Sequence, residues 1–238
     1  RFGQQVEQLG VSTAFEKATK LESQGDHLRI CTDSDVCYEA RRVILAMGVR
    51  RRHLNVPGED RLAGHGVGWC AVCDGAFFRS QDVAVVGGGN TALEDALYLS
   101  GICKTVHLLV RKNEFRGQAA LVQRVMEKEN IKARFQTEVT EILGENKVSG
   151  ITVTQNGTVE TIPLSGVFVA IGLSPDTSLY GDLVETDPSG YIVAGEDCRT
   201  SVPGIFAAGD IRTKEIRQIV TALSDGAVAA ELAGRELN

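Results

Sequence analysis

The sequence predicts an α/β protein built on a parallel, doubly wound sheet, and three features indicate this fold. A short apolar run at 83–86 leads directly into the glycine-rich turn Gly87-Gly88-Gly89-Asn90-Thr91-Ala92, and a segment with helical spacing follows to about residue 100. A second apolar run at 105–110 completes a strand–helix–strand unit. Such a unit implies parallel strands joined by a right-handed crossover.

Composition limits the class of protein. The chain has 238 residues, enough for one large domain or two modest ones, and 43% of them are apolar. The formal net charge of −6 argues against a nucleic-acid partner, which would require a basic stripe. No apolar run approaches the roughly 20 residues of a membrane span, and we expect neither a membrane partner nor a secretory signal. Because the chain begins with Arg1 and not with methionine, we expect a segment to be missing upstream.

The elements before the glycine turn are short. Residues 1–20 have a helical pattern, and two strands are expected at 28–32 and 36–40 around an Asp-Ser-Asp turn. A third strand is expected at 42–46, and the Pro-Gly cluster at 56–60 is typical of a linker. The three alternating glycines at 64–68 have no strand before them, so they are interpreted as a loop.

The elements after residue 110 mix helix and sheet. A helix is expected at 118–129, a polar β-meander at 131–163 with a hairpin turn at Asn156-Gly157, and a buried strand at 167–171. A last helix is expected at 214–236. Its apolar stripe would comprise Ile216, Ile219, Val220, Leu223 and Ala227.

The glycine turn matches the dinucleotide fingerprint G-x-G-x-x-G/A. Gly87 would allow the tight turn, Gly89 would let the backbone approach a pyrophosphate, and Ala92 would let helix and strand pack closely. Asn90 suits the N-cap position, and Thr91 follows it. The helix N-terminus would offer unpaired N–H groups to the phosphates.

The end of the following strand indicates which nicotinamide binds. An NAD site places an acid there, whereas this chain has Arg111, Lys112 and Arg116. One charge-assisted hydrogen bond to a 2′-phosphate contributes roughly 1.5–3 kcal/mol, so the cluster favours NADPH. The alternative is a solvated basic turn.

A Cys-x-x-Cys pair lies shortly before the glycine turn. Cys70 and Cys73 are close enough to form a disulfide, and Asp74 could move a proton during thiol exchange. A structural pair is the alternative. A zinc site or other metal site is not expected, because the chain has a single such pair and widely spaced histidines. The other four cysteines are interpreted as small core or surface residues in a reducing compartment, namely Cys31, Cys37, Cys103 and Cys198.

These motifs and Gly209-Asp210 occur in the order and at the intervals typical of one family. The chain resembles the low-molecular-weight, bacterial-type thioredoxin reductases over essentially its whole length. The resemblance implies two Rossmann-like, dinucleotide-binding domains. An NADPH domain with the dithiol (55–171) would be inserted in a discontinuous FAD domain (1–54 and 172–238).

The resemblance also implies residue roles and partners. Electrons would pass from NADPH through FAD to the Cys70–Cys73 disulfide, and Cys70 would attack thioredoxin or a similar small disulfide protein, with Cys73 nearest the flavin. Gly209 and Asp210 would hold the FAD ribityl and pyrophosphate region, and the segment Arg217-Gln218-Ile219 would lie beside the isoalloxazine ring. A cytoplasmic homodimer is expected.

The sequence departs from that family at three places. Val110 stands where the family usually has histidine, and Met47-Gly48-Val49 replaces Thr-Gly-Ala. The family's first G-x-G-x-x-G, for the FAD adenosine, does not occur in residues 1–54, so the first βαβ unit of the FAD domain is expected to be missing. Two alternatives therefore stay open. One is an NADPH-binding fragment without flavin or turnover, and the other is a related flavoprotein that reduces another disulfide protein.

Overall fold

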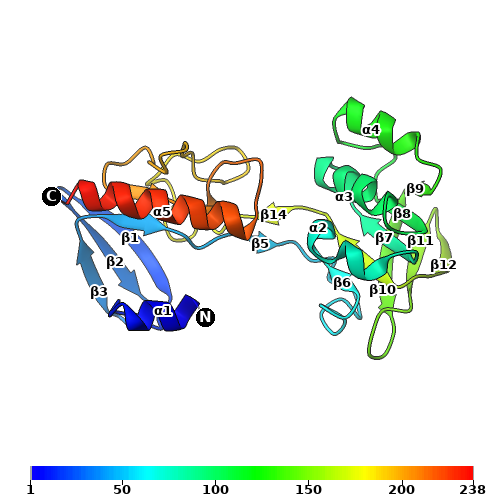
Figure 1. The fold of residues 1–238 in the computed structure, drawn as a ribbon, viewed down its shortest axis with the longest axis horizontal. Helices are drawn as coiled ribbons and strands as arrows, with labels where there is room; N and C mark the ends of the chain where they lie inside the picture. Colours follow the sequence, from blue (N-terminus) through cyan, green and yellow to red (C-terminus); the bar gives the residue numbers. More distant parts are fainter. Residues whose placement is uncertain (1, 238) are drawn as a thin grey trace. The chain divides into compact units, whose positions relative to one another are not determined.

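The computed structural model describes residues 2–237, which form two compact units. The first comprises the residues up to Arg50 and those from Ser174 onward, and the second is Arg51–Leu173. The chain passes between them at β5 (Arg50–Arg51) and β14 (Leu173–Ser174) (Figure 1). Across residues 2–237, no helix is both long and apolar enough to cross a membrane.

The second unit is organised around a parallel five-stranded sheet, and this confirms the predicted α/β, Rossmann-like fold. Its strand order is β6-β13-β7-β8-β9, and all neighbours in it are parallel. The strands are β6 (Val67–Gly68), β7 (Asp82–Val86), β8 (Thr105–Val110), β9 (Ile131–Phe135) and β13 (Gly166–Val169).

Helices cover one face of this sheet. They are α2 (Ala71–Asp74), the 3-10 turn η1 (Gly75–Phe78), α3 (Asn90–Ser100) and α4 (Ala119–Met126). Alternate strand residues such as Val83, Val85 and Leu108 pack beneath Leu93 and Leu99 of α3. The alternation follows from the two-residue period of a strand, which sends successive side chains to opposite faces.

An antiparallel meander, instead of further helices, packs against the other face. Its strands are β10 (Thr137–Leu143), β11 (Gly150–Gln155) and β12 (Thr158–Pro163). Ile142 and Ile151 share one buried cluster with Ala84 and Val86 of β7. The predicted hairpin turn at Asn156-Gly157 joins β11 and β12, with positive φ at both residues.

The first unit contains two small sheets and one long helix. The three-stranded antiparallel sheet has the order β1-β2-β3, and the parallel pair is β15-β4. Ala229 and Ala233 of α5 pack on Phe206 of β15. The elements are α1 (Phe2–Gln8), β1 (Ala18–Gln24), β2 (His27–Thr32), β3 (Cys37–Ala40), β4 (Val43–Leu45), β15 (Ile205–Ala207), η2 (Gly209–Ile211) and α5 (Ile219–Arg235).

Several predicted elements were wrong in detail. The first helix ends at Gln8, and β1 occupies the end of the expected helix at 1–20. Residues 131–135 form a parallel strand of the main sheet and not the start of the meander. Part of the glycine loop at 64–68 forms β6, because Val67 pairs with Val167.

The helix predictions also needed correction. Helix α4 ends at Met126, which is 62% exposed and not part of the buried face. Helix α5 begins at Ile219, so Ile216 lies before it. The expected apolar stripe of the last helix is exposed at Ile219, Val220 and Leu223, and small residues fill the buried face instead.

Candidate functional site

The glycine turn lies where the order of the parallel sheet reverses. From β7 the chain runs through α3 to β8 on one side, whereas β13 joins β7 on the other side. Such a switch point opens a crevice at the carboxyl ends of the strands. A cavity of about 810 Å³ occupies this position, and among its lining residues are Gly87, Gly89, Asn90, Thr91, Arg111, Lys112 and Arg116.

The turn has no room for side chains at its first two glycines. A Cβ on Gly87, whose φ is +150°, would lie 2.3 Å from the carbonyl oxygen of Ala170, and one on Gly88 would lie 2.9 Å from Val110. Ala92 is fully buried against the sheet. The backbone is therefore held close to the cavity, as a pyrophosphate cradle requires.

Asn90 has a different role from the predicted one. The N-cap of α3 is Gly89, and Asn90 is the first helical residue. The Asn90 Oδ1 atom instead accepts a hydrogen bond of 2.7 Å from the Gln118 N–H, just before α4. Asn90 thus joins the starts of two helices at the edge of the cavity.

The three predicted cations reach the same cavity from the loop after β8. All three side chains are exposed, and the Arg116 N–H donates to the Gly88 carbonyl at 2.7 Å, which ties this loop to the glycine turn. Glu138 also lines the cavity, with its Oε1 4.0 Å from the Arg111 Nε. Glu114, on the same loop as the cations, lines the cavity as well, so its basic side contains two acids.

The Cys70–Cys73 pair forms a disulfide at the start of α2 in the same unit. Cys70 is the N-cap, and its Sγ accepts a hydrogen bond from the Cys73 N–H at 3.2 Å. Cys70 is half-buried, whereas Cys73 is exposed.

Asp74 follows directly and is half-buried. The Asp74 N–H donates to the Cys70 carbonyl at 3.1 Å. A Cβ added to Gly68 would lie 3.0 Å from the Asp74 Oδ2, so Gly68 leaves room for this carboxylate. Phe77, 77% exposed, and Val72, 59% exposed, lie within four residues of Cys73 in sequence and give this surface an apolar character.

Asp95 on α3 carries an unusual pKa. Burial, followed by the charge of Glu94, raises the pKa of its carboxyl from 3.8 to about 7. An acid with a raised pKa binds a proton in the folded state that it lacks when unfolded, so folding stability should fall as pH rises from about 4 to about 7. At roughly 1.4 kcal/mol per pKa unit, the loss is at most about 4 kcal/mol.

We therefore expect Asp95→Asn to be more stable than the parent protein at pH 8 and similar to it at pH 4. Urea unfolding at both pH values measures this difference. Glu94→Gln, which removes only the neighbouring charge, is the control and should shift stability by less. An unchanged pH dependence in Asp95→Asn would contradict the assignment.

In the first unit, Gly209 and Asp210 begin η2 directly after β15. Gly209 has a φ of +78°, and the Oδ1 of Asp210 is buried without a hydrogen-bond partner in the described part of the chain. Arg217 lies over the ring of Tyr191, with its guanidinium carbon 4.1 Å from the ring centroid. Gln218 caps α5, and Ile219 is 76% exposed.

A buried ion cluster supports this loop, and the sequence reasoning missed it. Asp225 accepts two bonds from Arg212, at 2.8 and 2.9 Å, one from Lys214 at 2.6 Å and one from the Gly209 N–H at 2.9 Å. Burial by itself would raise the pKa of Asp225, but these hydrogen bonds outweigh it and hold the pKa well below its ordinary range. The signal available in the sequence was Asp225 itself, an acid on the face of the last helix that otherwise carries small residues.

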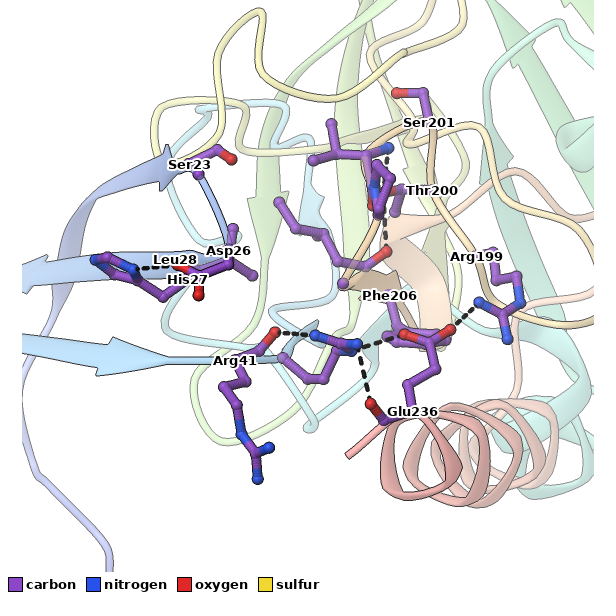
Figure 2. Close-up of a pocket in the computed structure, with 16 residues that line it drawn as sticks. Ser23, Asp26, His27, Leu28, Arg41, Arg199, Thr200, Ser201, Phe206 and Glu236 are labelled. Carbon is purple, nitrogen blue, oxygen red and sulfur yellow. Dashed lines mark hydrogen bonds and ion pairs between the residues drawn. The ribbon is translucent and has the colours of Figure 1, made fainter. Parts of the chain in front are cut away.

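A second cavity, of about 620 Å³, lies in the first unit (Figure 2). Arg41, Arg42 and Arg199 line it, and Glu236 forms ion pairs with the last two of them. Arg41 donates to the Leu237 carbonyl at 3.3 Å. None of the predicted site residues lies in this cavity.

The chain is similar to known proteins of one family. Residues 4–226 match the pyridine nucleotide-disulphide oxidoreductase family. The thioredoxin reductase of Listeria monocytogenes is 42% identical over 229 residues, which are 95% of this chain and 72% of that protein. The corresponding protein of Treponema pallidum is 40% identical over 94% of this chain and 73% of its own length.

Among solved structures, the thioredoxin reductase of Streptococcus pyogenes superposes with a TM-score of 0.92 at 40% identity. The match covers 98% of this chain and 77% of that one. The predicted resemblance is thereby confirmed. The chain belongs to the pyridine nucleotide-disulphide oxidoreductases and, within them, to the thioredoxin reductases.

Proposed function

We propose that this chain is an NADPH-dependent flavoprotein disulfide reductase that passes electrons from NADPH through FAD to the Cys70–Cys73 disulfide and on to thioredoxin or a similar small disulfide protein. One observation carries the proposal: a Cys-x-x-Cys disulfide and a cavity lined by the glycine turn and by three cations lie in the same compact unit. NADPH supplies a hydride and FAD relays its two electrons, one pair for each disulfide reduced.

The residues of the second unit fit a dinucleotide. Gly87 and Gly89 would face the pyrophosphate together with the N-terminus of α3, where Asn90 and Thr91 line the same cavity. Arg111, Lys112 and Arg116 would bind the 2′-phosphate. Gly87 and Gly88 have no room for a Cβ, which supports this orientation of the backbone, and the space beside Gly89 is open.

The residues of the first unit fit a flavin. The buried Oδ1 of Asp210, which has no hydrogen-bond partner among residues 2–237, offers an acceptor for a ribityl hydroxyl. Gly209 keeps the loop in a conformation that favours glycine. Arg217, Gln218 and Ile219 would lie along the ring system. Asp225 would hold this loop in shape through the Gly209 N–H.

In the dithiol, Cys70, which is the N-cap of α2, would attack the partner disulfide. Asp74 would hold the proton that the leaving thiolate of the partner takes up. Cys73 would then close the ring by attacking Cys70 in the mixed disulfide. The exposed Phe77 offers an apolar contact for the partner protein beside the sulfur atoms.

The choice of NADPH over NADH tests the nucleotide part of the proposal. The double variant Arg111→Ala with Arg116→Ala should weaken NADPH binding by more than about tenfold and leave NADH nearly unchanged, because each charge-assisted hydrogen bond contributes roughly 1.5–3 kcal/mol. Titration of nicotinamide fluorescence measures both dissociation constants. Lys128→Ala, an exposed cation outside the cavity, is the control. Equal losses for the two nucleotides would remove the 2′-phosphate assignment.

We also infer a homodimer. Several apolar side chains around the start of α5 are exposed, among them Ile216, Val220 and Leu223 at 63%, 71% and 53%. A second copy would remove part of this surface from water. Light scattering on the purified chain tests this inference, and a monomeric mass across the micromolar range would contradict it.

A cytoplasmic location is proposed on chemical grounds. The product of the reaction is a dithiol, which persists only where the surroundings are reducing. The buried free thiols of Cys103 and Cys198 are compatible with such surroundings. Cell fractionation tests the proposal.

A further inference from the structure

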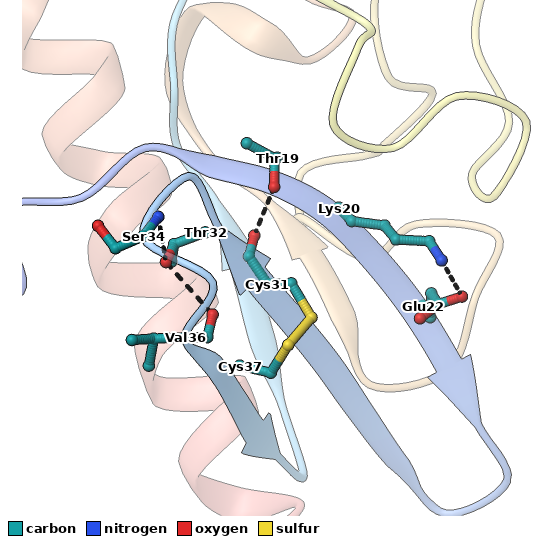
Figure 3. Close-up of a disulfide and its surroundings, with 8 residues drawn as sticks. All are labelled: Thr19, Lys20, Glu22, Cys31, Thr32, Ser34, Val36 and Cys37. Atoms are coloured by element: carbon teal, nitrogen blue, oxygen red, sulfur yellow. Dashed lines mark hydrogen bonds and ion pairs between the residues drawn. A yellow bond between two sulfur atoms is a disulfide. The ribbon is translucent and has the colours of Figure 1, made fainter.

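A second disulfide, Cys31–Cys37, joins β2 and β3 of the first unit, where the sequence predicted only core or surface thiols (Figure 3). The two cysteines are direct cross-strand partners, with Cα atoms 4.1 Å apart. The next pair toward the turn, Thr32 and Val36, is hydrogen-bonded: the Thr32 N–H donates to the Val36 carbonyl at 2.9 Å. Because such pairs alternate, the cysteines occupy a non-hydrogen-bonded position, where side chains approach most closely.

The disulfide lies on the face of the sheet that points away from the core. Leu28 and Ile30 pack in the core of this unit, and Cys31 has the opposite parity on β2. Strand β3 is at the edge of the sheet, and Cys37 on it is exposed. A thiol reagent can therefore approach Cys37 without opening the fold.

The hairpin does not depend on this disulfide for its closure. Besides the backbone bond, the Thr32 Oγ1 donates to the Val36 carbonyl at 3.2 Å and accepts from the Ser34 N–H at 3.4 Å. The sheet is attached to the core through Leu21 and Leu28, which are 6% and 3% exposed. The sulfur–sulfur bond can therefore open while the sheet persists.

We propose that Cys31–Cys37 is a second thiol–disulfide exchange site, which accepts two electrons from a dithiol and is separate from the Cys70–Cys73 pair. A donor thiolate attacks the Sγ of Cys37, and Cys31 leaves as a thiolate and takes a proton. The second donor thiol then attacks the mixed disulfide, frees Cys37 and closes the disulfide of the donor. The donor is oxidised and this pair is reduced by two electrons.

A cation lies on the same face of the sheet as the disulfide. Lys20 is the register partner of Cys31 on β1 and lies on the same face of the sheet. Its ammonium pairs with Glu22 at 2.7 Å and stays 63% exposed. The natural donor would be the dithiol protein that the enzyme produces. This choice of donor rests on the proposed function, whereas the exchange site itself does not.

The test uses dithiothreitol and the purified chain, without NADPH or a protein partner. After graded exposure, the sample is quenched in acid and alkylated, and the labelling of both cysteine pairs is measured by mass spectrometry. We expect Cys31 and Cys37 to change from unlabelled to fully labelled at dithiothreitol concentrations within about tenfold of those that reduce Cys70–Cys73. The far-ultraviolet circular dichroism should stay constant.

Two results would overturn the proposal: labelling of Cys31 and Cys37 only in denaturant, or equal labelling with and without dithiothreitol. The double variant Cys31→Ser with Cys37→Ser is the control, and it should keep the circular dichroism spectrum. If that variant does not fold, the parent protein in dithiothreitol still gives the same readout. Because no turnover enters the assay, a failure of the proposed function leaves this result unaffected.

Discussion

Replacing Cys73 by serine is expected to reduce NADPH-driven disulfide reduction to the background rate and to leave NADPH binding unchanged. Two thiols are needed to release a partner with two electrons, and Cys70 alone stops at the mixed disulfide. The nucleotide cavity does not include Cys73. Reduction of a chromogenic disulfide measures the first quantity, and nicotinamide fluorescence measures the second.

A thiol-trapping assay tests the same roles of Cys70 and Cys73 without turnover. The reduced Cys73→Ser chain should form a stable mixed disulfide with oxidised thioredoxin, because Cys70 attacks and no second thiol resolves the adduct. Cys70→Ser should trap little. The double variant Cys31→Ser with Cys37→Ser, which removes the other disulfide, should behave as the parent protein does. Retained turnover in Cys73→Ser would disprove the assigned roles.

Replacing Asp225 by asparagine is expected to cost about 3–5 kcal/mol of the free energy of unfolding, because it removes the buried counter-charge that Arg212 and Lys214 share. Arg212 keeps an ion pair with Glu196 at 3.5 Å, but Glu196 is exposed. Arg212 is 3% exposed, and the side chain of Lys214 is 7% exposed. The same change weakens the contact to the Gly209 N–H, so the loop that begins η2 should loosen as well. Urea unfolding at pH 7 measures the cost.

The matched control lies on the same helix. Glu231→Gln removes an exposed carboxylate that pairs with Arg235 at 3.0 Å, and it should cost less than about 1 kcal/mol. The sign of the pH dependence gives a second check. Because the pKa of Asp225 is depressed, its contribution is complete above the unfolded value of 3.8 and is lost as pH falls below it. Similar unfolding energies for the two variants would contradict the ion cluster.

The local signals in the sequence were strong at the nucleotide site. Gly87 and Ala92 follow from close packing at one tight turn, whereas Gly89 was predicted for the approach of a pyrophosphate. The spacing of the three predicted the turn, the preceding strand and the following helix. The Cys70–Cys73 disulfide was equally local, since only two residues lie between the two cysteines. Each of these features depends on atoms within a short stretch of chain.

Features that depend on distant partners were not predictable. Asp225 is stabilised by residues 11 and 13 positions away and by a loop 16 positions away. The same holds for residues 131–135, whose place in the parallel sheet depends on pairing with β8. For α5, the sequence predicted that the apolar stripe would be the buried face. The buried face is instead made of small residues that fit against Phe206.

The sequence by itself determined the family, the parallel α/β fold, the glycine turn and the redox dithiol, because these depend on residue type and short spacing. Only the tertiary structure decided which cysteines pair across the β2–β3 hairpin, what neutralises Asp225 and which face of α5 is buried. The physical reason is that hydrophobic periodicity shows that a face exists but not what lies against it. A cross-strand disulfide or a buried ion cluster forms only when strand register and packing bring its members within bonding distance.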